Sequence, residues 1–220
     1  IICSPMTSLK TSIKTITYLS DIGCLEIQGA SLKLYQKLSG FVTETALDEM
    51  QEHLRRNPSL RLSLNVGDNE MNDCQFLEQL VSGCRRLKIQ LQQIKLEITE
   101  SSRSESGLIA AFCQRAREYG FNISLDDFGT GTANIEWLTV LDFDEIKIDR
   151  IFIANIDDPV KRALLVSVVK GLRGTGKPLV FEGVETPAQF KFIRYLDKKA
   201  LIQGWFTGKP APIAALNIQV

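Results

Sequence analysis

The sequence has no excess of charge of either sign, because its 26 lysine and arginine residues balance its 26 aspartate and glutamate residues. Proteins that bind nucleic acid polymers or anionic membranes through their overall charge usually carry a basic excess. The composition therefore predicts no nucleic acid partner. Whatever the chain binds must be recognised by a local group of side chains.

The signatures of secretion and of membrane insertion are also missing. No stretch approaches the roughly 18 consecutive apolar residues of a membrane span, and no signal peptide is visible. The five cysteines form an odd set without a CxxC pair, which argues against a disulfide framework and against a zinc site. We therefore expect reduced thiols, a cytoplasmic location and no membrane span in this segment.

No linker rich in proline, glycine or serine divides the 220 residues, so residues 1–220 are expected to form one domain. The sequence opens at Ile1 inside an apolar stretch, and we expect this domain to have been cut from a longer protein. Short apolar runs alternate with longer amphipathic stretches. The expected strands are 60–66, 89–98, 121–125, 144–149, 178–184 and 200–206, and the expected helices are 43–56, 73–86, 104–120, 158–176 and 186–199.

Strand and helix alternate at the intervals typical of βα units, which predicts an α/β fold with a mostly parallel sheet. A polar residue stands at the C-terminal end of each expected strand. These residues are Asn65, Glu97, Asp126 with Asp127, Lys147, Glu182 and Gln203. If the sheet closes into a barrel, their side chains converge at the rim where barrel active sites lie.

Each of these residues, taken singly, is explained equally well as a turn former or a helix cap. Four residues of the set are acids, namely Glu97, Asp126, Asp127 and Glu182. If they lie close together, their carboxylates would repel one another unless a cation neutralised them. Carboxylate and amide oxygens suit Mg²⁺, Mn²⁺ or Ca²⁺. Lys147 could orient or deprotonate a water there, or hold a phosphate. The pattern favours a metal-dependent phosphate-ester site over a set of unrelated caps.

Six segments in order resemble the motifs of the EAL domain family of bacterial cyclic di-GMP phosphodiesterases. They are "SLNV", "KLEITES", "LDDFGTG", "DEIKIDRIFI", "FEGVET" and "IQGWFTGKP". The resemblance covers nearly the whole chain. It implies a modified TIM-like (β/α)8 barrel with one antiparallel strand, a two-metal Mg²⁺ or Mn²⁺ site, and hydrolysis of cyclic di-GMP to linear pGpG.

The resemblance also implies a role for each residue of those motifs. Asn65, Glu97 and Asp126 would bind the first metal, and Asp126 with Asp127 would bind the second. Lys147 would position or activate the attacking water, while Glu182 and Gln203 would complete the metal and water shell. Glu100 would brace the loop of the "DDFGTG" motif.

Residues 5–22 depart from the pattern of the family's first strand. In that pattern "QPI", a spacer and "EALLRW" supply a metal-binding Glu and a phosphate-binding Arg. Aligning Pro5 with the proline of that pattern places Tyr18 at the Glu position and Ile22 at the Arg position. Losing one anionic ligand weakens metal binding, and a two-metal reaction needs both ions. We therefore interpret the chain as a degenerate EAL domain with impaired catalysis.

Three functions follow from this interpretation. The chain could be a catalytically impaired regulator that binds cyclic di-GMP or a protein partner, an active phosphodiesterase with a substitute ligand, or a scaffold that binds protein without nucleotide. Trp137 lies where family members pair with a second barrel, so we also expect a homodimer, with ordinary helix packing of Trp137 as the alternative.

Overall fold

The described part of this computed structural model comprises residues 32–99, 106–130 and 134–213. It contains six strands, which are β1 (Leu62–Val66), β2 (Ile94–Thr99), β3 (Asn122–Phe128), β4 (Glu145–Ile148), β5 (Leu179–Phe181) and β6 (Leu201–Ile202). The helices are α2 (Leu32–Arg56), α3 (Asp68–Asn72), α4 (Phe76–Leu87), α5 (Ser106–Tyr119), α6 (Asn134–Val140), α7 (Pro159–Arg173) and α8 (Pro187–Leu196). Short 3₁₀ turns occupy Leu91–Gln93 and Arg150–Phe152.

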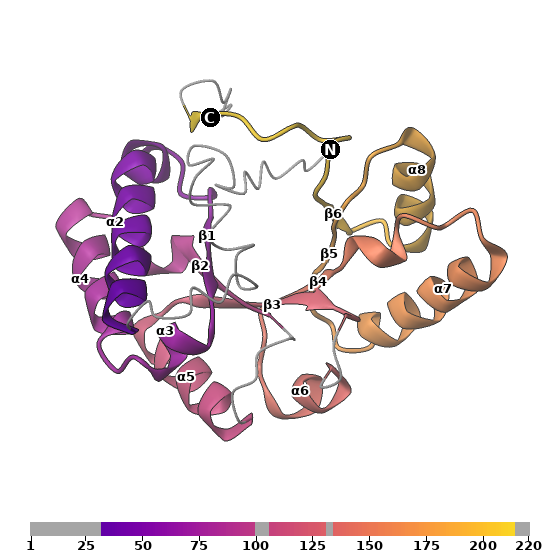
Figure 1. Cartoon of the computed structure of the whole chain (residues 1–220). Helices are drawn as coiled ribbons and strands as arrows, with labels where there is room; N and C mark the ends of the chain where they lie inside the picture. The colour runs from indigo at the N-terminus through magenta and orange to yellow at the C-terminus, as the bar shows by residue number, and fades with distance from the viewer. Residues whose placement is uncertain (1–31, 100–105, 131–133, 214–220) are drawn as a thin grey trace.

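The six strands form one sheet in the order of the sequence, and every neighbouring pair of these strands is parallel. Figure 1 shows the sheet as a curved wall with the long helices outside it, as in a barrel. This arrangement confirms the predicted α/β fold with a parallel sheet. The antiparallel strand that the family resemblance implies is not among the six described strands.

The strands are held by an apolar core because the side chains that point outward from the sheet are almost all Leu, Ile, Val or Phe. Leu96, Ile123, Leu125, Ile146 and Phe181 are completely buried. Helix α4 turns one apolar face toward this core, from Phe76 through Leu80 to Cys84. Alternation along a strand then leaves the other face of the sheet, which lines the barrel interior, for polar residues.

The largest errors in the predicted boundaries are the starts of one helix and one strand. Helix α2 begins at Leu32 instead of near Thr43, so the helix passes through Gly40, a residue that costs only about 1 kcal/mol inside a helix. The predicted strand 89–98 starts later, at Ile94, because Gln93 is used otherwise. The Gln93 side-chain amide is buried and donates to the carbonyl oxygens of Leu54 and Asn57, 2.8 and 3.0 Å away.

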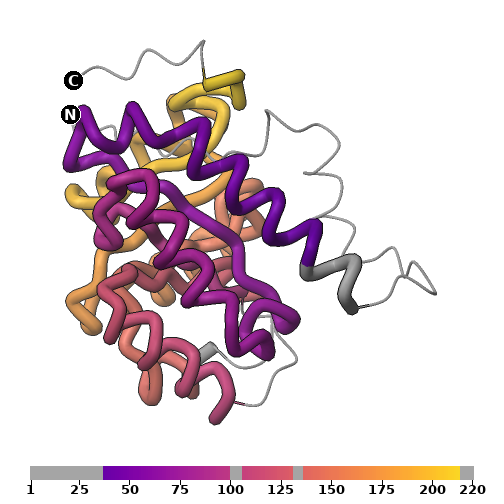
Figure 2. The backbone as a smooth tube through the Cα atoms, turned by 90° about the vertical axis from the view of Figure 1, so that its left-hand side faces the viewer, coloured from indigo at the N-terminus to yellow at the C-terminus, as the bar shows by residue number. Residues whose placement is uncertain are grey.

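Figure 2 views the molecule from the side on which α2, α4 and α5 lie in front of the sheet, with α7 and α8 behind it. The long helix α2 packs against α4. Trp137 on α6 is only 3% exposed and belongs to the core, which favours the packing explanation for this residue. The predicted homodimer therefore gains no support from Trp137 and stays a prediction.

Within the described residues, no helix is both long and apolar enough to cross a membrane. Cys84 and Cys113 are buried free thiols, and burial raises their pKa values to about 11 and about 12. Such thiols stay protonated and pack as small apolar groups, as the sequence predicts.

Candidate metal and phosphate-ester site

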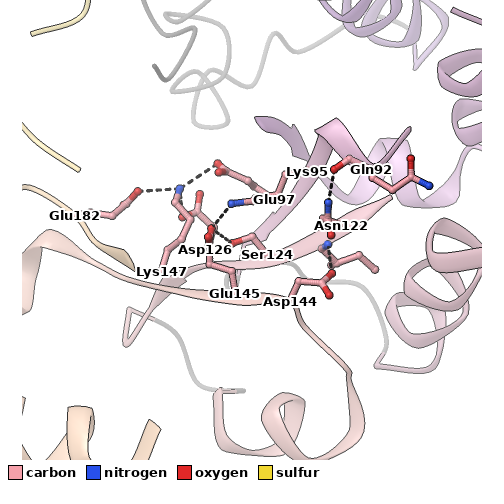
Figure 3. A network of polar contacts seen from close by, with 11 residues as sticks. Gln92, Lys95, Glu97, Asn122, Ser124, Asp126, Asp144, Glu145, Lys147 and Glu182 are labelled. Atoms are coloured by element: carbon pink, nitrogen blue, oxygen red, sulfur yellow. Dashed lines mark hydrogen bonds and ion pairs between the residues drawn. The ribbon is translucent and has the colours of Figure 1, made fainter. Parts of the chain in front are cut away.

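Lys147 lies at the centre of the candidate site, inside the barrel. Its ammonium Nζ is 3.0 Å from Glu97 Oε2, 2.7 Å from Asp126 Oδ1 and 2.8 Å from Glu182 Oε1. Figure 3 shows the three carboxylates turned toward this one nitrogen from β2, β3 and the end of β5. Because Lys147 is 3% exposed, three acids and one lysine share a space that water barely reaches.

Strand register explains why these residues meet. In the parallel pairings, Asn65 lies beside Glu97, Glu97 beside Ser124, and Ser124 beside Glu145. Asp126 and Lys147 stand two residues beyond Ser124 and Glu145, so period-two alternation keeps them on the same interior face. The strand-end residues therefore converge as predicted, but they do so around a lysine.

The electrostatics of the cluster shift two pKa values. Burial lowers the pKa of Lys147, but the negative charges of Glu97, Asp126 and Glu182 together outweigh burial and hold that pKa well above its usual value. Burial raises the pKa of Glu182 to about 7, with Lys147 opposing the rise and Asp126 adding to it. In this arrangement Lys147 stays protonated and donates a hydrogen bond to Glu97, and Glu182 takes up a proton more readily than an ordinary glutamate does.

Asp127 should point away from the site, because adjacent residues of a regular strand face opposite sides of the sheet. It does not, because its backbone has a left-handed φ of +54° and the register of β3 against β4 shifts between Leu125 and Phe128. One carboxylate oxygen each of Asp126, Asp127 and Glu182 can therefore lie within 4.8 Å of one another. Asp tolerates this conformation better than most residues, and strained backbone of this kind is typical of functional sites.

Substitutions at Asp127 separate the backbone from the charge. D127G is expected to be about 1 kcal/mol more stable than D127A, because only glycine adopts the left-handed conformation without a Cβ penalty. D127N should resemble the wild type in stability, since Asn also tolerates this conformation. If Asp127 binds a divalent cation, all three variants should also lose any rise in melting temperature that Mn²⁺ produces in the wild type. Equal stability of D127A and D127G in denaturant would contradict the left-handed backbone.

A second polar layer lies beneath this cluster in the barrel interior. Lys95 Nζ is 2.7 Å from Glu145 Oε1, and the Ser124 hydroxyl donates to the same oxygen over 3.3 Å. Both charged residues are buried, and Figure 3 shows them beside the cluster around Lys147. This pair was not predicted from the sequence, because neither residue stands at the C-terminal end of a strand. The available signal was alternation, since Lys95 and Glu145 stand two residues before Glu97 and Lys147.

Two glycines shape the turns that carry Glu182 and Gln203. Gly183 has a φ of +66°, and a Cβ there would lie 2.4 Å from the Cβ of Arg150. Gly204 has a φ of +151°, and its Cβ would lie 2.3 Å from the carbonyl oxygen of Val184. The backbone of Gln203 is fixed through Phe181 and Val184, to which it is hydrogen-bonded at 2.9 and 3.1 Å. The two turns are thus held close together by backbone contact.

Alanine at position 204 tests this contact. G204A is expected to lower the free energy of unfolding by roughly 3 kcal/mol or more, because backbone atoms must move to admit the methyl group. The matched control is G171A in the interior of α7, where a Cβ meets no atom within 4 Å. G171A should raise stability by up to about 1 kcal/mol through helix propensity. A G204A variant as stable as the wild type in denaturant titrations would refute the close packing of the two turns.

The structure brings together only part of the predicted set. Glu97, Asp126, Lys147 and Glu182 meet directly, and Asp127 joins them through its bulge. Asn65 is exposed at the end of β1 beside Glu97, and Gln203 is half-buried at the end of β6. Glu100, Tyr18 and Ile22 lie outside the described residues, so their predicted roles are untested.

The donor chemistry of the cluster fits a divalent cation. Asp126 Oδ1 is buried and accepts no well-aligned hydrogen bond within the described chain, although it forms an ion pair with Lys147. Three carboxylates with ligand atoms this close are an arrangement that a hard cation stabilises. The fold and the site together define a parallel α/β barrel protein with a cluster of acidic side chains and a buried lysine at the C-terminal rim of its strands.

Comparison with known proteins identifies the family. The family model described as "EAL domain" matches residues 17–210, so the chain belongs to the EAL domain family. A cyclic di-GMP phosphodiesterase of Pseudomonas aeruginosa is 34% identical over 163 residues, which cover 73% of this chain and 28% of that protein. The cyclic di-GMP phosphodiesterase NbdA of the same organism is 28% identical over 203 residues, covering 89% of this chain and 25% of NbdA.

Solved structures agree with this assignment. The EAL enzyme Bd1971 in its form with cAMP and cyclic di-GMP bound superposes with a TM-score of 0.78 at 25% identity, over 90% of this chain and 53% of that one. The EAL domain of Mycobacterium smegmatis DcpA gives a TM-score of 0.73 at 26% identity, over 80% of this chain and 81% of that one. The chain spans about a quarter of the length of the two curated relatives.

Proposed function

We propose that this EAL domain binds cyclic di-GMP and divalent cations at the rim formed by Asp126, Asp127 and Glu182, and that it turns the nucleotide over slowly. The observation that carries the proposal is the proximity of these three carboxylates to one another, together with the ion pairs that two of them, Asp126 and Glu182, form with Lys147 inside the barrel. The similarity to cyclic di-GMP phosphodiesterases supports cyclic di-GMP as the ligand.

In this proposal the acidic residues bind the metal ions, and the lysine orients a water or a phosphate oxygen. Glu97, Asp126, Asp127 and Glu182 would hold the Mg²⁺ or Mn²⁺ ions, with Asn65 and Gln203 at the margin of the site. When bound, such ions activate a water and stabilise the leaving oxygen of a phosphate ester. Lys147 is held in place by a hydrogen bond to Glu97 and by ion pairs with Asp126 and Glu182, and from this position its ammonium group would orient a water or a phosphate oxygen.

Slow turnover is expected from the residues at positions 18 and 22 of the sequence. With Tyr18 aligned to a metal-binding Glu and Ile22 to a phosphate-binding Arg, a first metal would have one anionic ligand fewer and the phosphate would have no bidentate partner at these positions. Nucleotide binding suffers less than chemistry, because guanine contacts do not depend on that Glu. The domain then acts in cyclic di-GMP signalling as a receptor or regulator.

An active phosphodiesterase is the second candidate, favoured by the presence of Lys147, Asp126, Asp127 and Glu182 in one place. Calorimetric titration with cyclic di-GMP in Ca²⁺ and in EDTA, followed by chromatography after incubation with Mg²⁺ or Mn²⁺, separates the two. The proposal predicts saturable binding in Ca²⁺, weaker binding in EDTA and little pGpG. Rapid pGpG release would show that the domain is an active phosphodiesterase. If no heat of binding were measured, the remaining function would be a scaffold that binds protein without nucleotide.

A further inference from the structure

Helices α7 and α8 carry basic residues but no acidic ones, although the whole chain is neutral. Their 15 and 10 residues include Lys161, Arg162, Lys170, Arg173, Lys191 and Arg194, without any Asp or Glu. After α8 come Asp197, which is its C-cap residue, and then Lys198 and Lys199. The neutral total of the sequence therefore hides a local basic surface.

Apolar side chains also point outward from these helices. Helix α7 buries Leu165, Val169 and Leu172, yet Val160 is 68% exposed and Leu164 is 57% exposed. On α8, Ile193 is buried and Tyr195 is 84% exposed. Tyr195 has an apolar ring with a polar tip, a combination that suits a boundary between water and an apolar phase.

The two helices that carry these side chains lie side by side. The Arg162 guanidinium lies 4.3 Å from the centre of the Phe192 ring, and Arg173 donates to the carbonyl oxygen of Leu196 over 3.2 Å. Figure 1 shows α7 and α8 as neighbours on the side of the barrel opposite α2. We call the exposed side chains of α7, α8 and residues 198–199 the basic face.

The positive charge of this face is largely available to a partner. The basic face includes five lysines, Lys161, Lys170, Lys191, Lys198 and Lys199, and all five are exposed. None of the ion pairs between described residues involves any of them. Lysine is depleted in protein–protein interfaces, whereas clustered lysines near apolar side chains are attracted to anionic lipid headgroups.

We propose that the basic face docks the domain onto the surface of an anionic lipid bilayer, with Val160, Leu164 and Tyr195 entering the headgroup region. Because no described helix can span a membrane, the contact is peripheral. It involves neither the metal site nor the nucleotide, since the basic face lies on the outer helices and the site lies inside the barrel.

Vesicle co-sedimentation of the full chain tests this docking. The chain should bind phosphatidylcholine vesicles that contain about one third phosphatidylglycerol, should not bind pure phosphatidylcholine, and should be released by high salt. K170E/K191E should lower the partition coefficient by at least about 25-fold, because each cation near an anionic surface contributes about fivefold. L164S, which removes one inserting side chain, should lower it by roughly fivefold.

The matched control is K37E/R55E on α2, which makes the same change of net charge with exposed residues on the opposite side of the barrel. It should bind anionic vesicles nearly as well as the wild type. An equal loss for both double variants would overturn the proposal, as would equal binding to neutral vesicles or no vesicle binding at all. Binding of soluble polyglutamate through Lys170 and Lys191, without vesicle binding, would show that the face takes an acidic polypeptide instead.

Discussion

K147M is expected to lower the free energy of unfolding of the metal-free chain by about 3–5 kcal/mol, because it leaves three buried carboxylates without their shared cation. Methionine keeps most of the side-chain volume, so the loss reports charge more than packing. Urea titration in EDTA measures it. The same substitution at a surface ion pair, K177M, removes one of the two cationic partners of the exposed Asp142, the other being Arg117, and should cost less than about 1 kcal/mol.

Divalent cations should then restore much of the stability that K147M loses. Lys147 occupies the centre of the carboxylates in place of a metal ion, and a cation that binds there in its absence neutralises the same charges. The Mn²⁺-induced rise in melting temperature should therefore be larger in K147M than in the wild type. An unchanged stability of K147M in EDTA, or a smaller Mn²⁺ effect than in the wild type, would contradict the role of Lys147 as internal counter-ion.

D126N is expected to abolish function without unfolding the protein. Asp126 belongs both to the lysine cluster and to the acidic triad with Asp127 and Glu182, so its charge bears on every ion bound there. Divalent affinity should fall by about 100-fold or more, and any pGpG release should fall by at least two orders of magnitude. Metal-free stability should hold or rise, because the cluster contains more acids than lysines.

D142N provides the control for D126N, since Asp142 is exposed and pairs with Lys177 outside the barrel. It should leave metal affinity and nucleotide binding unchanged. Calorimetry with Mn²⁺ and cyclic di-GMP, on both variants and the wild type, measures the difference. If D126N bound Mn²⁺ as tightly as D142N does, the acidic triad would not be the metal centre.

Much of the site was predictable because it depends on regular strand geometry. Glu97, Asp126, Lys147 and Glu182 end consecutive parallel strands, and the register of such strands places their ends at one rim. The ion pairing of Lys147 with all three acids was not predictable, because the sequence does not reveal which side chains share a proton or a charge inside the barrel.

Other features escaped prediction for identifiable reasons. Asp127 reaches the site only through a left-handed residue and a register shift, which period-two alternation cannot signal. Helix α2 runs through Gly40, which in sequence looks like a break. The basic face was invisible in the net charge, because acidic residues elsewhere cancel the lysines of α7 and α8.

We propose that Asp126, Asp127 and Glu182 bind divalent metal ions and that these ions take part in binding cyclic di-GMP. Electron paramagnetic resonance of free Mn²⁺ during titration of the chain with the metal, with and without cyclic di-GMP, tests it most directly. We expect saturable Mn²⁺ binding in the wild type. Cyclic di-GMP should strengthen this binding, and the D126N substitution should remove it. Mn²⁺ that stays free in the wild type at every protein concentration, with the nucleotide present, would contradict it.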